Sequence, residues 1–138
     1  MPTAQILLVD DEPDVTHILS KRLARRGYVC ASASNGQDAL NKMREQPYGV
    51  VIMDVKMPVM DGIQALQAIK AQWPATQVIL LSGHADMQLA VRAMSAGAFG
   101  YLMKPVELDD LLFKIEDAQT QRRLEASGAA APLGEKIA

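Results

Sequence analysis

The chain has 138 residues, of which 49% are hydrophobic and 22% are charged, and its formal net charge is −2. This length and composition are typical of one folded domain and argue against disorder, while the near-neutral charge argues against direct contact with nucleic acid. No apolar run is long enough to span a membrane and the N-terminus lacks the layout of a secretory signal, so we expect a cytoplasmic protein. The single cysteine, Cys30, excludes an intrachain disulfide, and its apolar surroundings favour a buried free thiol.

Apolar segments and helical patterns alternate along the chain. In order, the expected elements are a strand at residues 5–9, a helix with Asp11 or Glu12 as its cap and Pro13 in its first turn, a weaker strand at 28–31, a helix capped by Ser34 or Asn35, a strand at 50–53, a helix opened by Asp61-Gly62, a strand at 78–81, a helix through Leu89 and Met94 to Gly97, a strand at 99–103 and a helix from Leu108 to about Leu124. Residues 50–53 are apolar without alternation, as in a central parallel strand buried on both faces. The five alternations with short connections predict one doubly wound α/β domain with right-handed crossovers.

We place this domain at residues 1–125. From residue 126 to residue 138 the composition shifts to Ala, Gly, Ser and Pro, which predicts a flexible tail or the start of a linker. Most of the methionines are expected to fill gaps in the core, because the thioether side chain is unbranched and adaptable.

Polar residues follow four of the expected strands at the point where each strand ends. They are Asp10 and Asp11 after the first strand, Asp54 after the third, Ser82 after the fourth and Lys104 after the fifth. Because the carboxyl ends of parallel strands open on one edge of the sheet, we expect these side chains to meet there. Each residue alone has an ordinary interpretation as a helix cap, a loop carboxylate, a turn hydroxyl or a surface lysine, so only their joint order indicates a site. Three carboxylates on one edge are electrostatically unfavourable unless a cation and a phosphoryl group use them.

These residue types suit magnesium and phosphoryl chemistry. Mg²⁺ prefers oxygen ligands, which Asp11 and Asp54 can provide directly, Asp10 through water, and the loop after Asp54 through one backbone carbonyl. A carboxylate is also a competent nucleophile toward phosphorus and forms an acyl phosphate. Lys104 supplies positive charge to the phosphoryl oxygens, and the Ser82 hydroxyl can donate a hydrogen bond to them.

With these residues in place, the sequence closely resembles the receiver domain of bacterial two-component response regulators over roughly residues 4–123. The motifs that carry the resemblance are Leu8-Val9-Asp10-Asp11-Glu12, Met53-Asp54-Val55-Lys56-Met57-Pro58, Asp61-Gly62, Leu81-Ser82-Gly83-His84 and Tyr101-Leu102-Met103-Lys104-Pro105. The resemblance implies a flavodoxin-like fold of five βα units with strand order 2-1-3-4-5. It also implies a protein that catalyses only its own phosphorylation and dephosphorylation, not a metabolic reaction.

The resemblance implies a role for each residue at the predicted edge. Asp54 is the expected acceptor of a phosphoryl group from the phosphohistidine of a histidine kinase, and Lys104 is expected to contact that group. The expected magnesium ligands are Asp11, Asp54 and the backbone carbonyl of Lys56, with Asp10 assisting. The bond between Lys104 and the proline after it is typically cis in the family.

Ser82 and Tyr101 match the family's switch pair, in which the hydroxyl moves toward the phosphoryl group and the aromatic ring turns inward. Considered without the family, Tyr101 is more simply an edge-strand aromatic that packs. Lys56 and His84 stand at positions that flank the phosphoryl group and vary across the family, so we expect them to tune the lifetime of the acyl phosphate. Family members often dimerise through the fourth helix, fifth strand and fifth helix, so a second copy of the chain joins the histidine kinase as an expected partner.

Three other classes of protein stay open at this point. A magnesium-dependent aspartyl-phosphate hydrolase of the haloacid-dehalogenase type needs a second aspartate two residues after the nucleophile, and that position is Lys56 here. A flavin-binding module needs a phosphate loop after the first strand, where Asp10, Asp11 and Glu12 would repel a phosphate. A receiver-shaped interaction module that is never phosphorylated would not need the complete set of acidic residues and lysine.

The stretch from Gly83 to Met94 resembles receivers attached to transcriptional output domains, with a stand-alone single-domain regulator as the rival.

Overall fold

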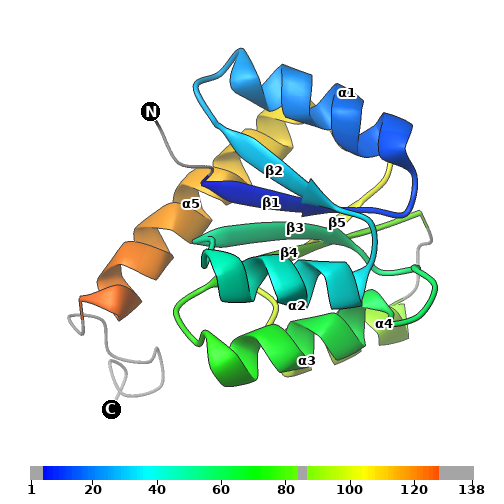
Figure 1. Ribbon diagram of the computed structural model, residues 1–138, viewed down its shortest axis with the longest axis vertical. Helices are drawn as coiled ribbons and strands as arrows, with labels where there is room; N and C mark the ends of the chain where they lie inside the picture. The colour runs from blue at the N-terminus through cyan, green and yellow to red at the C-terminus, as the bar shows by residue number, and fades with distance from the viewer. Residues whose placement is uncertain (1–4, 84–86, 128–138) are drawn as a thin grey trace.

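The computed structural model describes residues 5–83 and 87–127, which form a five-stranded parallel sheet with helices on both faces (Figure 1). In chain order the elements are β1 (Ile6–Val9), α1 (Pro13–Ala24), β2 (Cys30–Ala33), α2 (Gly36–Glu45), β3 (Val50–Asp54), α3 (Gly62–Gln72), β4 (Gln77–Ser82), α4 (Met87–Ser95), β5 (Gly100–Met103) and α5 (Leu108–Ala126). The strand order is β2-β1-β3-β4-β5, and all neighbouring strands are parallel. The predicted doubly wound fold and its strand order are therefore confirmed.

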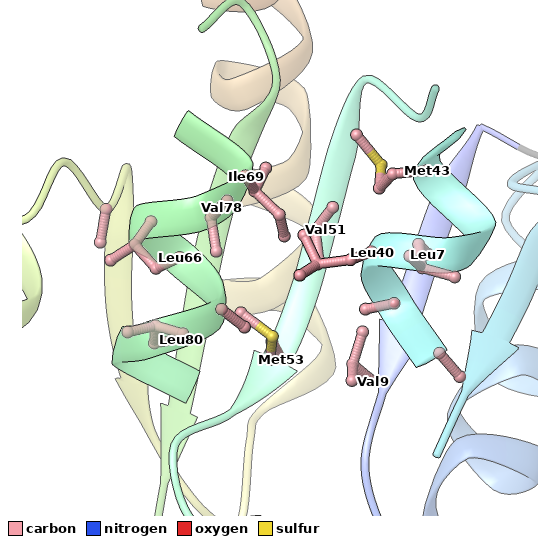
Figure 2. Close-up of a cluster of buried hydrophobic side chains, with 14 of the residues drawn as sticks. Leu7, Val9, Leu40, Met43, Val51, Met53, Leu66, Ile69, Val78 and Leu80 are labelled. Atoms are coloured by element: carbon pink, nitrogen blue, oxygen red, sulfur yellow. The ribbon is translucent and has the colours of Figure 1, made fainter. Parts of the chain in front are cut away.

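The central strands are buried on both faces because alternate residues enter two separate hydrophobic clusters. One cluster joins the sheet to α2, α3 and α4, and Figure 2 shows its strand residues Leu7, Val51, Val78 and Leu80 among Leu40, Met43, Leu66 and Ile69 of the helices. The other cluster joins the opposite face to α1 and α5 through Ile6, Leu8, Ile52, Ile79, Leu23, Leu111 and Ile115. The sheet is thus the middle layer of three, and only its strand ends are free to build a site.

Helix α3 begins at Gly62, as the Asp61-Gly62 pair predicts, and its first turn forms a capping box. The Asp61 side chain accepts a hydrogen bond from the backbone N–H of Gln64, and the Gln64 side chain accepts one from the N–H of Asp61. Asn35 likewise caps α2 by accepting from the N–H of Asp38. Glu12 occupies the N-cap position of α1, but its side chain makes no capping hydrogen bond.

The edge strand β2 lies two residues later than predicted. The sequence suggested residues 28–31, whereas the paired residues are Cys30–Ala33, in register with Ile6–Val9 of β1. The N–H of Tyr28 instead donates to the carbonyl of Leu23, so this residue still belongs to the turn that ends α1. Cys30 is a free thiol, as expected, but it is half-buried rather than buried, and this partial burial raises the pKa of the thiol to about 11.

The methionines divide between the core and one surface. Met43 and Met53 are fully buried, as expected, but other methionines belong to a set of exposed apolar residues on α4, β5 and α5. That set, which we call the α4–β5–α5 face, consists of Met87, Val91, Met94, Met103 and Phe113. Among the described residues, no helix is both long and apolar enough to cross a membrane.

Candidate functional site

Three of the predicted side chains meet at the carboxyl edge of the sheet. The Lys104 ammonium donates to Asp54 Oδ2 at 3.1 Å and to Asp10 Oδ2 at 3.2 Å, so one lysine bridges the residues that end β1 and β3. The backbone N–H of Lys104 donates to the carbonyl of Ser82 at 2.7 Å, which ties the end of β5 to the end of β4. The peptide bond to Pro105 is cis, as the resemblance implies.

The two bridged carboxylates are shielded from solvent, with Asp10 5% exposed and Asp54 8% exposed. Burial by itself lowers the pKa of Lys104, but the hydrogen bonds and negative charges of Asp54 and Asp10 outweigh this effect and raise that pKa above its usual value. The remaining oxygens are also used: Asp10 Oδ1 accepts from the N–H of Glu12 at 2.9 Å, and Asp54 Oδ1 accepts from the N–H of Lys56 at 3.3 Å. The site therefore holds two buried carboxylates, which are oriented by backbone N–H groups and by the Lys104 ammonium.

Asp11 lies beside this pair and faces outward. One carboxylate oxygen from each of Asp10, Asp11 and Glu12 can be chosen so that all lie within 4.8 Å of one another, and Asp11 and Glu12 are exposed. A cleft of about 490 Å³ opens next to Asp11 and is also lined by Lys56. Hard oxygen donors beside open space fit Mg²⁺, which keeps several waters in its coordination shell. Sequence reasoning missed Glu12 as a member of this cluster, because its place before Pro13 also suits a helix cap.

Ser82 and Tyr101 lie on the same side of the sheet. Tyr101 is paired with Leu80 and Met103 with Ser82 in the β4–β5 ladder, and residues two apart on a strand point to the same face. Ser82 is buried, and Tyr101 is partly buried against the cluster shared with α2, α3 and α4. This is the relative placement that the switch pair requires, and the movement itself stays a prediction.

The two residues expected to tune the phosphoryl lifetime are placed differently. Lys56 is exposed at the start of the loop after Asp54, and His84 lies outside the described residues. Their effect on lifetime therefore stays a prediction, as does the use of the Lys56 carbonyl as a ligand.

Gly62 lies against the backbone of Asp54 and Val55, a role that sequence reasoning did not assign. Its N–H donates to the carbonyl of Val55 at 2.8 Å. A Cβ atom at this position would lie 2.6 Å from the Asp54 carbonyl oxygen and 2.8 Å from Val55 Cα, so only glycine lets α3 begin this close to the end of β3. The sequence signal was available as the glycine in the first position of a helix, where Ala is the better helix former.

The loop between Asp54 and Gly62 carries backbone strain. Val59 has a φ of +73° and is 84% exposed, and the N–H of Met60 donates to the carbonyl of Pro58 at 2.8 Å across it. A β-branched residue in this conformation is uncommon, because its side chain crowds the neighbouring carbonyl. The strain lies in the segment that separates Asp54 from Asp61, the N-cap of α3.

Fold and site together define a class, the doubly wound α/β domains in which a buried carboxylate and a lysine meet at neighbouring strand ends. The family model of the response regulator receiver domain matches residues 6–116. The chain therefore belongs to this family and is a receiver domain of two-component response regulators.

Comparison with individual proteins agrees with this assignment. The chain is 35% identical over 123 residues to the DNA-binding transcriptional regulator NtrC of Proteus hauseri, an alignment that covers 89% of this chain and 26% of the relative. A receiver domain protein from Clostridium thermocellum has 37% identity and a TM-score of 0.83, covering 88% of this chain and 98% of the other. The beryllofluoride-activated NtrC4 receiver domain dimer has 34% identity and a TM-score of 0.80, covering 85% of this chain and 97% of the other. The chain thus spans about a quarter of the length of the curated relatives it matches.

We expect Gly62→Ala to destabilise the protein by about 1–3 kcal/mol, the usual range for overpacking. The added methyl group meets backbone atoms of Asp54 and Val55, and these atoms can make room only if the Asp54 backbone shifts. Gly83→Ala is the matched control, since a Cβ atom there meets nothing within 4 Å. Chemical denaturation measures both variants, and equal stability of the two would contradict this role of Gly62.

Proposed function

We propose that the chain accepts a phosphoryl group on Asp54 from the phosphohistidine of a histidine kinase, in a Mg²⁺-dependent reaction, and thereby changes a protein-binding surface. The observation that carries this proposal is the buried Asp54 carboxylate, hydrogen-bonded to Lys104 and next to the acidic edge of Asp10 and Asp11. Membership in the receiver family supports the same reading.

Each residue has a distinct task in this proposal. A carboxylate oxygen of Asp54 attacks phosphorus, the phosphorus–nitrogen bond to the donor imidazole breaks, and its electron pair returns to the ring. Lys104 turns from the two carboxylates toward the phosphoryl oxygens and stabilises their charge. Asp11, Asp54 and the Lys56 carbonyl are the residues that would hold Mg²⁺, with Asp10 assisting, and the cation offsets repulsion between the carboxylates and the phosphoryl oxygens.

The switch follows from contacts that exist only after phosphorylation. The phosphoryl group adds negative charge and acceptor oxygens at Asp54, so Ser82 gains a partner on that side. Ser82 and Tyr101 share one face of the sheet, so movement of the hydroxyl opens space toward which the ring turns. The α4–β5–α5 face is the surface that we expect to report this change, because Tyr101 is part of β5.

We infer the role of a signalling receiver, with residues 1–125 as the receiver and residues 126–138 as a tail or the beginning of a linker. The matched relatives are transcriptional regulators of which this chain covers about a quarter, so regulation of transcription through an attached output domain is a proposal for the whole protein. A receiver-shaped interaction module without phosphorylation is the alternative, and the following experiment separates the two.

With Mg²⁺ and a small phosphodonor such as acetyl phosphate or phosphoramidate, we expect intact-mass analysis to show one added phosphoryl group. Asp54→Asn should abolish this adduct, because the amide is not a nucleophile toward phosphorus. Asp14→Asn, an exposed residue in the first turn of α1, should keep the adduct. The same adduct on Asp54→Asn would refute the acceptor assignment, and no adduct on the natural chain would favour the interaction module.

Removal of Asp11 should weaken Mg²⁺ binding about 10- to 100-fold, the loss expected for one charged partner. Isothermal titration of Asp11→Ala measures this, with Asp14→Ala as the control of equal charge change at an exposed position. Titration of Glu12→Gln shows in addition whether the third carboxylate of the cluster contributes. Equal affinity in Asp11→Ala and the natural chain would count against Asp11 as a ligand.

We propose a second copy of the chain as the second partner, bound through the α4–β5–α5 face to form a homodimer. Phosphorylation at Asp54 should increase self-association, measured by sedimentation, because the face carries exposed apolar groups that a second copy can cover. Val91→Lys should abolish the increase. Ile18→Lys is the matched control, since Ile18 on α1 is 54% exposed and Val91 is 56% exposed. Dimerisation that survives Val91→Lys, or that is lost equally in both variants, would place the interface elsewhere.

A further inference from the structure

A second pocket lies at the opposite edge of the sheet, where the strands begin. It has a volume of about 460 Å³ and is lined by Gln5 before β1, by Gln46 and Gly49 before β3, and by Gln119, Arg122 and Arg123 of α5. Figure 1 shows the second half of α5 passing the starts of the strand arrows, away from the arrowheads where Asp10 and Asp54 lie. Gln5 and Asp10 are separated by the length of β1, roughly 16 Å, so this pocket is distinct from the proposed phosphoryl site.

The position of Arg122 is set by a glycine. A Cβ atom on Gly49 would lie 3.1 Å from Nε and 3.2 Å from Cδ of Arg122, so the arginine stem crosses the backbone where a side chain would otherwise stand. This close approach brings the base of α5 against the turn before β3. Gly49 therefore allows Arg122 to line the pocket.

The two arginines of this pocket carry positive charge that no ion pair with a described carboxylate neutralises. Within residues 5–83 and 87–127, no ion pair joins Arg122 or Arg123 to an acidic side chain. The carboxylate closest to them in sequence, Glu125, is already engaged: one oxygen accepts from Gln77 Nε2 at 2.6 Å and the other from Gln121 Nε2 at 3.1 Å. Two guanidinium groups that form no ion pair with a described carboxylate thus line one concavity together with three glutamine side chains.

We propose that this pocket binds a small molecule through an oxyanion, either a phosphate or a carboxylate. Guanidinium groups match the two oxygens of such an anion in a fork, and glutamine amides add neutral donors and acceptors around it. The volume is within the range of small-molecule sites in proteins. A bound anion would join α5 to the turn before β3 and to the start of β1, and would stiffen the segment by which the chain leaves the domain.

The test is a titration of the 138-residue chain, without Mg²⁺ and at constant ionic strength, with pyrophosphate and separately with citrate. Backbone amide signals, Gly49 among them, and the side-chain amide signals of Gln5, Gln46 and Gln119 report binding by nuclear magnetic resonance. We expect saturable shifts that are confined to these residues and to α5. Arg122→Gln should weaken binding about 10- to 100-fold, while Arg25→Gln, an exposed arginine after α1, should leave it unchanged.

Gly49→Ala provides a second variant with no change of charge, since the added methyl group would crowd Nε and Cδ of Arg122 and make the arginine shift over the backbone. It should also weaken binding, which separates a built site from general attraction to positive charge. Binding of pyrophosphate alone or citrate alone identifies the anion, and binding of both supports the shared chemistry. Shifts spread over the surface, equal binding by Arg122→Gln and Arg25→Gln, or no binding by the natural chain would overturn the proposal.

Discussion

The bridge from Lys104 to Asp10 and Asp54 is the interaction on which the rest of the site depends. Two buried carboxylates at neighbouring strand ends repel each other, and the lysine between them, at 3.1 and 3.2 Å, offsets that repulsion. A buried charge left without its partner is strongly destabilising, so each of the three residues constrains the other two. The same bridge holds the Lys104 ammonium 3.1 Å from Asp54, where the phosphoryl group of the proposed reaction would compete with the carboxylates for it.

The surrounding backbone holds this bridge in place by two close approaches. The hydrogen bond from the N–H of Lys104 to the carbonyl of Ser82 joins the ends of β4 and β5, so the lysine and the hydroxyl are fixed to one frame. Gly62 brings the start of α3 against the carbonyl of Asp54, which supports Asp54 from the other side. Val59, in the loop between Asp54 and Gly62, is exposed and has a strained backbone conformation. The site thus combines residues held by regular strands with a loop of irregular backbone.

The fold was predictable because a parallel strand buried on both faces appears in the sequence as an uninterrupted run of apolar residues. Residues 50–53 are apolar throughout, and the side chains of β3 are indeed buried on both faces. The edge strand β2 gave a weaker signal, since one side is exposed, and its position was wrong by two residues because the turn after α1 continues to Tyr28. The carboxylate and lysine positions could be predicted from their order along the chain. Which carboxylates Lys104 bridges could not, because that depends on side-chain geometry.

Other features escaped sequence reasoning because they arise from distant segments. Methionine fills cores and also covers interaction surfaces, so composition alone could not separate buried Met53 from exposed Met87. Gly62 and Gly49 look locally like turn or helix residues, yet Gly62 is required where α3 approaches the Asp54 carbonyl, and Gly49 lies under the Arg122 side chain of a helix remote in sequence. The strand order came from the family resemblance, since alternation of strands and helices does not determine which strands are neighbours.

Helix α5 runs from the edge where the strands end toward the edge where they begin. It begins four residues after Lys104 and has 19 residues, which corresponds to about 28 Å of helix. Its first half packs on the sheet through Leu111 and Ile115, and its last turns reach the amino edge, where Glu125 accepts from Gln77 and Arg122 lies over Gly49. Asp10, Asp11 and Glu12 gather where β1 ends, and Arg122 and Arg123 line the pocket where the strands begin. Helix α5 therefore joins the segment that follows Lys104 to the pocket that Arg122 lines.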